Sequence, residues 1–184
     1  MTNVLSKEKT LKVLVVNIYN QNSTHIHLPI TDEEMKAFWK TFNPGENDCE
    51  VQGVDVLTSL NDHLTNEHEA ALRQLHNCNL ETINKVATIL QDNAEFAFLM
   101  EGCERYEYAY DVFTNKKYTI FTNIESDEDL GLAWAKHHEW FKNLRHPELE
   151  LYFNAGECGS TLRDANEVIY DVGHNKALHI HRPN

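Results

Sequence analysis

The stretch LKVLVVNIYNQNSTHIHLPITDEEMKAFWKTF, residues 11–42, decides the fold class of this chain. Residues 11–19 are rich in β-branched side chains, a polar turn covers 20–23, and residues 24–28 predict a second strand that closes a hairpin. Thr31 and Glu34 then match the capping box that begins a helix. Apolar side chains follow at helical spacing: Met35, Phe38, Trp39 and Phe42. A hairpin followed by an amphipathic helix predicts a mixed α+β fold.

Residues 46–101 extend this pattern in two steps. Residues 46–56 predict a third strand, and Gly53 marks a bulge because the apolar side chains change phase there. Residues 59–101 carry helical stripes without a β signal between them, with capping patterns at 59–62 and at Asn79. We expect a small helical bundle in this region.

The last third predicts strands again. Tyr106, Tyr108 and Tyr110 alternate, which favours a strand through residue 113 that pairs with residues 118–123 about a turn. Ser126 begins a capping pattern for a helix, and residues 155–159 are rich in glycine. Residues 168–172 and 177–181 form a closing hairpin. The predicted architecture has an α/β unit at 1–58, a helical unit at 59–103 and a second α/β unit at 104–184, both sheets being antiparallel.

Four cysteines are widely spread among the 184 residues and include no C-x-x-C pair, so reduced thiols fit better than a disulfide framework. No apolar stretch reaches membrane-spanning length, and the N-terminal lysines precede no long apolar run. These observations predict a cytoplasmic protein.

The charge is unevenly distributed. Between residues 46 and 111, fourteen carboxylates against three cations leave a net charge of −11 out of −13 for the whole chain. The regular apolar spacing in this stretch argues against disorder. The acidic side chains are candidate partner-binding residues: Glu46, Asp48, Glu50, Asp55, Asp62, Glu67, Glu69, Glu81, Asp92, Glu95, Glu101, Glu104, Glu107 and Asp111.

This acidic balance argues against direct binding of nucleic acid or anionic membranes and favours basic partners, including proteins that bind DNA. Glu46, Asp48 and Glu50 fall on one face of the predicted strand, about 7 Å apart. Such a row can imitate the phosphates of one DNA strand loosely, since these recur about every 3.4 Å. A solvated acidic face without mimicry is the alternative.

No catalytic, cofactor or metal site is expected. The eleven histidines include the pairs His25/His27 and His179/His181 on predicted strands and 137–138 on a helix. A metal site needs three or four converging ligands, and no spacing indicates such convergence. Cys158 can be read as a nucleophile on a tight turn, but no base is identified for it. A small metal-dependent or thiol enzyme is therefore the competing class.

Four stretches together resemble the ArdA antirestriction proteins, DNA mimics carried by mobile elements and phages. These are the hairpin leading into residues 27–34 (HLPITDEE), the acidic strand 48–55 with the helical middle, residues 126–133 (SDEDLGLA), and residues 151–159 with the closing hairpin. The sequence departs from the family where Cys158-Gly159-Ser160 replaces an aromatic-Gly-basic run.

The resemblance implies an elongated acidic homodimer, joined through the third unit, that inhibits type I restriction–modification enzymes by occupying their DNA groove. Candidates for the dimer interface or the core of this unit are Tyr106, Tyr108, Trp134 and Tyr152. Another DNA-binding machine, such as a CRISPR effector, is an alternative target.

Overall fold

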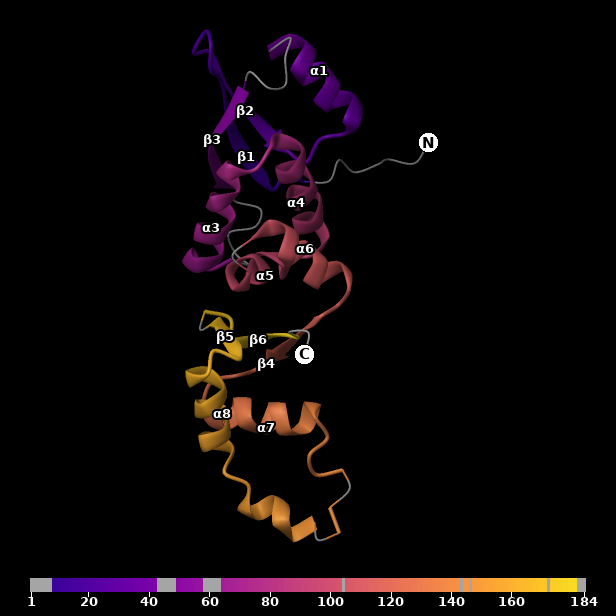
Figure 1. Ribbon diagram of the computed structural model, residues 1–184, viewed down its shortest axis with the longest axis vertical. Helices are drawn as coiled ribbons and strands as arrows, with labels where there is room; N and C mark the ends of the chain where they lie inside the picture. Colours follow the sequence, from indigo (N-terminus) through magenta and orange to yellow (C-terminus); the bar gives the residue numbers. More distant parts are fainter. Residues whose placement is uncertain are drawn as a thin grey trace. The chain divides into compact units, whose positions relative to one another are not determined.

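The computed structural model describes residues 8–42, 49–57, 64–103, 105–142, 144–145, 147–171 and 173–181. The chain divides into two compact units, Met1–Tyr106 and Glu107–Asn184. Each contains a three-stranded antiparallel sheet accompanied by helices (Figure 1). The α+β fold class is therefore confirmed, while the finer division into three units stays a prediction. No helix in the described ranges is both long enough and apolar enough to cross a membrane.

The sheet of the first unit has the order β2-β1-β3. Strands β1 (Leu11–Asn17) and β2 (Ser23–Leu28) form the expected hairpin, and β3 (Cys49–Val56) pairs antiparallel with the other edge of β1. Leu14 faces Gly53 while Val15 faces Val51, so Gln52 is the extra residue of a bulge. The bulge expected around Gly53 is confirmed. Residues 46–48 of the expected third strand lie outside the described residues.

Helix α1 (Asp32–Phe42) follows the hairpin and begins with the expected capping box. Thr31 Oγ1 accepts from the Glu34 amide at 3.2 Å, and the Glu34 carboxylate accepts from the Thr31 amide at 2.8 Å. The bonds satisfy two amides that the helix itself leaves unpaired. Hydrogen bonds from the Thr31 amide and then from the Thr31 side chain also hold the pKa of Glu34 below its usual value, because they stabilise the ionised carboxylate.

The helical middle consists of α3 (Asn66–Arg73), the 3-10 turn η2 (Gln74–Asn77), α4 (Leu80–Asp92) and α5 (Phe96–Gly102), which gather beside the first sheet in Figure 1. Thr65 caps α3, and Asn79 caps α4 as expected, by accepting from the Thr82 amide at 2.8 Å. The capping pattern expected at 59–62 lies outside the described residues. The largest fully buried side chains of this unit are Leu11, Val13, Leu28, Leu72, Leu75, Ile83, Leu90, Phe96, Phe98 and Leu99.

Two long-range polar contacts join α4 to the sheet. The Asn84 amide group accepts from the Ile30 amide at 2.8 Å and donates to the Ile30 carbonyl at 2.9 Å. The Thr10 hydroxyl donates to the Ala87 carbonyl at 3.0 Å in a buried position. The helical middle and the hairpin therefore share one core and a common set of hydrogen bonds.

Residues 106–114 form helix α6, so the expected strand through the alternating tyrosines is wrong. Ala109 and Val112, three residues apart, are both fully buried, whereas Tyr108 and Tyr110 remain about two-fifths exposed, at 41% and 42%. A three-residue spacing of buried positions is that of a helix face. The alternating tyrosines therefore suggested a strand, whereas the buried residues Ala109 and Val112 follow helical spacing.

The second sheet has the order β4-β6-β5, from β4 (Tyr118–Thr122), β5 (Val168–Asp171) and β6 (Lys176–Ile180). The closing hairpin β5–β6 is confirmed. The hairpin expected between residues 106–113 and 118–123 is wrong, because β4 pairs instead with β6, nearly sixty residues away in the chain. Phe121, Ile124, Leu130, Val168 and Ala177 form the core of this unit.

Helices α7 (Asp127–His137) and α8 (Ala155–Asp164) pack on one another beside this sheet, with the short 3-10 turn η3 (Pro147–Tyr152) between them in the chain (Figure 1). Ser126 caps α7 as expected, accepting from the Asp129 amide at 3.2 Å. The alternative interpretation of residues 157–160 as a tight turn is wrong, since these residues lie within α8. Asn154 caps that helix by accepting from the Glu157 amide at 3.1 Å.

Candidate functional site

The candidate interaction surface is the set of carboxylates between residues 46 and 111. Glu46, Asp48, Asp62 and Glu104 lie outside the described residues. Of the remaining ten, two are half-buried, Glu69 and Glu101, and none is buried. The other eight are exposed to solvent: Glu50, Asp55, Glu67, Glu81, Asp92, Glu95, Glu107 and Asp111.

The bulge in β3 places two of these carboxylates on the same face of the sheet. Glu50 pairs with Val16 of β1, and Asp55 pairs with Lys12. Positions 12 and 16 share one face of β1, because side chains alternate along a strand. Without the extra residue Gln52, Glu50 and Asp55 would point to opposite faces. The bulge therefore keeps the acidic residues of β3 together and leaves the opposite face to the core.

Three carboxylates lie in the first turns of helices. Glu67 and Glu69 begin α3, and Glu81 begins α4. A negative charge is stabilising there, because it faces the positive end of the helix dipole. Asp92 occupies the opposite end of α4, where the same dipole disfavours an acid. The helix dipole thus explains why Glu67, Glu69 and Glu81 are acidic. It does not explain the acidic residue at position 92.

Two described carboxylates of the first unit lie close to nitrogen-bearing side chains. Glu69 accepts from Arg73 one turn later at 2.8 Å. Glu101 lies 3.3 Å from Nε2 of His68. An exposed pair of the first kind contributes only about 0–1 kcal/mol to stability.

His68 is buried and has a structural role that the sequence did not reveal. Its Nδ1 accepts from the Thr65 amide at 3.2 Å, completing a capping box in which histidine replaces the usual glutamate. Its ring packs on Phe98, with 5.2 Å between ring centroids. Since Nδ1 accepts a hydrogen bond, Nε2 carries the proton of the neutral ring, and this atom lies 3.3 Å from the Glu101 carboxylate. The Thr-x-x-His spacing is the signal that would have located this cap.

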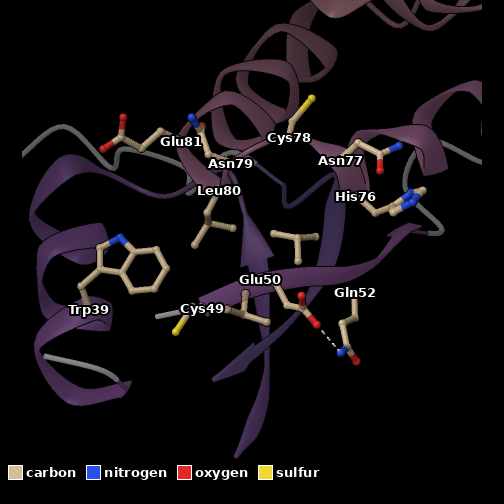
Figure 2. Close-up of a pocket in the computed structure, with 12 residues that line it drawn as sticks. Trp39, Cys49, Glu50, Gln52, His76, Asn77, Cys78, Asn79, Leu80 and Glu81 are labelled. Carbon is tan, nitrogen blue, oxygen red and sulfur yellow. Dashed lines mark hydrogen bonds between the residues drawn. The ribbon is translucent and has the colours of Figure 1, made fainter. Parts of the chain in front are cut away.

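A hollow of about 800 Å³ lies in the first unit between the β3 edge and the start of α4 (Figure 2). Trp39 of α1 lines one side of it, and Leu80 and Val51 contribute apolar surface. Residues 76–79, at the end of η2 and just before α4, form another wall. Glu50 and Glu81 belong to the lining, so acidic side chains from two elements lie beside the same hollow.

Glu107 and Asp111 are carried by α6. The Asp111 carboxylate accepts from Lys117 at 2.9 Å and from the Asn115 side chain at 2.7 Å. Asp111 therefore also anchors the turn between α6 and β4.

The four candidates for the dimer interface differ in how far they are buried. Trp134 packs against the sheet core, 6.0 Å from Phe121 between ring centroids, and is a core residue. Tyr152 is 82% exposed beside Leu151, which is 84% exposed. Tyr106 is half-buried and Tyr108 is exposed, both on α6. Leu151 and Tyr152 therefore remain candidates for a contact surface, because they are exposed, apolar and adjacent in the chain.

Cys158 lies on α8 rather than on a tight turn, and its surroundings do not activate it. Burial raises the pKa of the Cys158 thiol above its usual value. Burial also raises the pKa of Cys103 to about 11. Because the thiolate is the nucleophile, both side chains are held in the unreactive form at neutral pH.

The histidines are distributed differently from what their spacing suggested. His25 and His27 are exposed on β2. His137, His138, His179 and His181 instead meet around Trp134 in the second unit. The spacing of the histidines in the sequence did not predict this cluster, because the cluster depends on how α7 packs against β6. No protein-family model matches this chain, and no curated protein matches it significantly.

Proposed function

We propose that this chain is an acidic DNA mimic of the ArdA kind, which occupies the DNA-binding groove of a type I restriction–modification enzyme. The observation that supports this most is the exposure of the carboxylates in a stretch of net charge −11. Eight of the ten described members are exposed and none is buried. A folded chain that tolerates this much self-repulsion on its surface presents a field suited to a basic partner.

The partner's groove supplies lysine and arginine side chains that ordinarily neutralise phosphates. Carboxylates on β3 and on the helix ends act as surrogates for those phosphates, so binding depends steeply on salt. Long-range attraction mainly raises the association rate, because it guides the two surfaces together before contact. The proposal places the protein in the bacterial cytoplasm with its target enzyme, without direct binding of nucleic acid.

Asp92 favours mimicry over a merely solvated acidic face. Helix dipoles account for Glu67, Glu69 and Glu81, but they disfavour an acid at the end of α4. The β3 bulge that places Glu50 and Asp55 on one face is a second feature that needs a reason. A surface that gathers exposed carboxylates from β3 and from the ends of helices fits a binding role.

Homodimerisation is part of the proposal and is assigned to the second unit. Leu151 and Tyr152 are its most exposed large apolar residues among those described. A full chain that sediments as a monomer at micromolar concentration would contradict this assignment. Substitution of both residues by serine should convert the dimer to monomer while the unfolding transition stays in place.

The test of the function is competition with duplex DNA for a type I restriction–modification enzyme at two salt concentrations. We expect the triple variant Glu50→Gln, Asp55→Asn, Asp92→Asn to compete more weakly than the unmodified chain, and most clearly at low salt. The matched control neutralises three exposed acids elsewhere, Glu148→Gln, Glu150→Gln and Asp164→Asn. This control removes the same net charge, so it distinguishes the effect of these particular surface positions from the effect of total charge.

Equal competition by both triple variants and the unmodified chain at both salts would show that the acidic stretch is only a solvated surface. Failure of the unmodified chain to compete at all would exclude this class of target. If the chain instead competed with DNA for a CRISPR effector in the same assay, DNA mimicry would be retained and the proposed target would change.

A further inference from the structure

Four histidines of the second unit form one continuous cluster. His137 and His138 come from the C-terminal end of α7, with 5.0 Å between their ring centroids. His179 of β6 and His181 just beyond it are also 5.0 Å apart between centroids. Trp134 joins the two pairs, lying 4.6 Å from His138 and 4.7 Å from His179 between centroids.

Two of these rings aim a nitrogen at the same point. Thr119 of β4 lies opposite His179 in the sheet. Its hydroxyl oxygen is 2.9 Å from Nε2 of His181 and 3.5 Å from Nε2 of His137. The Nε2 atoms of His137 and His181 therefore converge from a helix and a strand on one small volume beside the hydroxyl.

The spacing of the rings suits a shared ion. A zinc–nitrogen bond is about 2.0–2.1 Å, so two imidazoles on one tetrahedral ion have ring centres roughly 5 Å apart. The two histidine pairs have that separation already. Hydrogen bonding alone does not explain the cluster, because Nδ1 of His179 is buried and makes no hydrogen bond within the described part of the chain.

The chemistry of the side chains also indicates which metals would bind. Neutral imidazole is the form of histidine that binds metals. Imidazole sets of this kind prefer zinc, nickel and copper over calcium or magnesium.

We propose that His137, His138, His179 and His181 form a binding site for one divalent transition-metal ion of the zinc, nickel or copper class, with Nε2 of His137 and His181 as the first two ligands. Rotation of the His138 and His179 side chains supplies the remaining nitrogens. Such an ion cross-links the end of α7 to the β6 strand. The inference is independent of the acidic surface, which lies on other residues.

The experiment uses the full chain, without a polyhistidine tag and treated with chelator, titrated with Zn²⁺ in a calorimeter. We expect one ion per chain with micromolar or tighter affinity. The double variant His137→Gln, His181→Gln should bind at least about tenfold more weakly, since it lacks both converging nitrogens. The matched control His25→Gln, His27→Gln changes two exposed histidines with the same strand spacing on β2 and should bind as the unmodified chain does.

A second measurement keeps the test decisive if the double variant fails to fold. Cu²⁺ bound in the cluster should quench the emission of Trp134, whose ring touches two of the four histidines. Quenching at one equivalent should largely vanish in Trp134→Phe, which leaves the two other tryptophans as internal references. No Zn²⁺ binding by the unmodified chain, equal loss of binding in both double variants, or unchanged quenching in Trp134→Phe would each overturn the site.

Discussion

Gly159 of α8 lies against the backbone carbonyl of Asp127 at the start of α7, so closely that a Cβ on Gly159 would come within 1.9 Å of that oxygen. One turn further, the relationship is reciprocal: a Cβ on Gly131 of α7 would lie 2.0 Å from the carbonyl oxygen of Ala155 in α8. The two helices therefore cross at a pair of glycines, each in contact with the other helix's backbone. Close packing of this kind leaves no room for even one added methyl group.

Gly159→Ala should lower the stability of the second unit. The obstacle is backbone rather than a movable side chain, so the helices must separate, at a cost of roughly 1–3 kcal/mol or more. Gly131→Ala should act in the same direction. Thermal unfolding followed by circular dichroism measures both effects.

Gly156→Ala is the matched control for this crossing. It lies in the same helix, and its Cβ would meet nothing closer than the Asn154 side-chain oxygen at 3.9 Å. Replacing this helical glycine should stabilise the chain by up to about 1 kcal/mol. If Gly156→Ala destabilised the chain as much as Gly159→Ala, the close approach would not be the cause.

Asn84→Ala should destabilise the first unit by roughly 1–3 kcal/mol, because it leaves the Ile30 amide and carbonyl without their α4 partner. Asn77→Ala is the comparison, since that exposed amide group bonds only to the nearby Gln74 carbonyl at 3.3 Å. Chemical denaturation of each variant supplies the measurement. If the two variants had equal denaturation midpoints, the Asn84–Ile30 contact would not contribute to holding α4 against the rest of the first unit.

Tyr170 should make the second unit sensitive to alkali. Burial and the nearby negative charge of Asp127 raise the pKa of Tyr170 to about 12, and its hydroxyl donates to that carboxylate at 3.2 Å. An unfolded tyrosine ionises near pH 10, so the folded state retains the proton longer than the unfolded state does. The resulting stabilisation is complete below about pH 10 and is lost as the pH rises towards 12.

Tyr170→Phe should therefore lose stability at neutral pH but show a shallower decline above about pH 10 than the unmodified chain. Unfolding temperatures across this range provide the comparison. Tyr152→Phe, at an 82% exposed position, should follow the unmodified chain. Parallel declines for all three proteins would mean that the Tyr170–Asp127 contact does not govern the alkaline transition.

Cys103 and Cys158 should react slowly with iodoacetamide at neutral pH, because burial raises the pKa of both thiols, that of Cys103 to about 11. Mass spectrometry of the folded chain should find both sites labelled far more slowly than in urea. Cys158→Ala should compete with DNA for the target enzyme within a few-fold of the unmodified chain. Rapid labelling of Cys158 in the folded chain would revive the thiol-enzyme hypothesis.

Local signals in the sequence were sufficient for much of the fold. The β1–β2 hairpin, the Thr31–Glu34 capping box, the cap at Asn79 and the closing hairpin depend on neighbouring residues, and each is present in the structure. The phase change at Gly53 also located the bulge, because alternation along one strand is visible without knowing its partner. The exposed acidic stretch followed from composition, since ionised carboxylates mostly remain in contact with water.

Tertiary structure decided what depends on distant partners. The tyrosine alternation at 106–110 pointed to a strand, but burial of Ala109 and Val112 made it a helix. The pairing of β4 with β6 and the glycine crossing of α7 and α8 unite segments far apart in the chain. The four-histidine cluster arose in the same way, because only the packing of α7 against β6 brings His137 and His181 to a common point. Spacing in the sequence specifies which side chains share one face of a helix or strand. Which other helix or strand packs against that face depends on the free energy of the whole packed core.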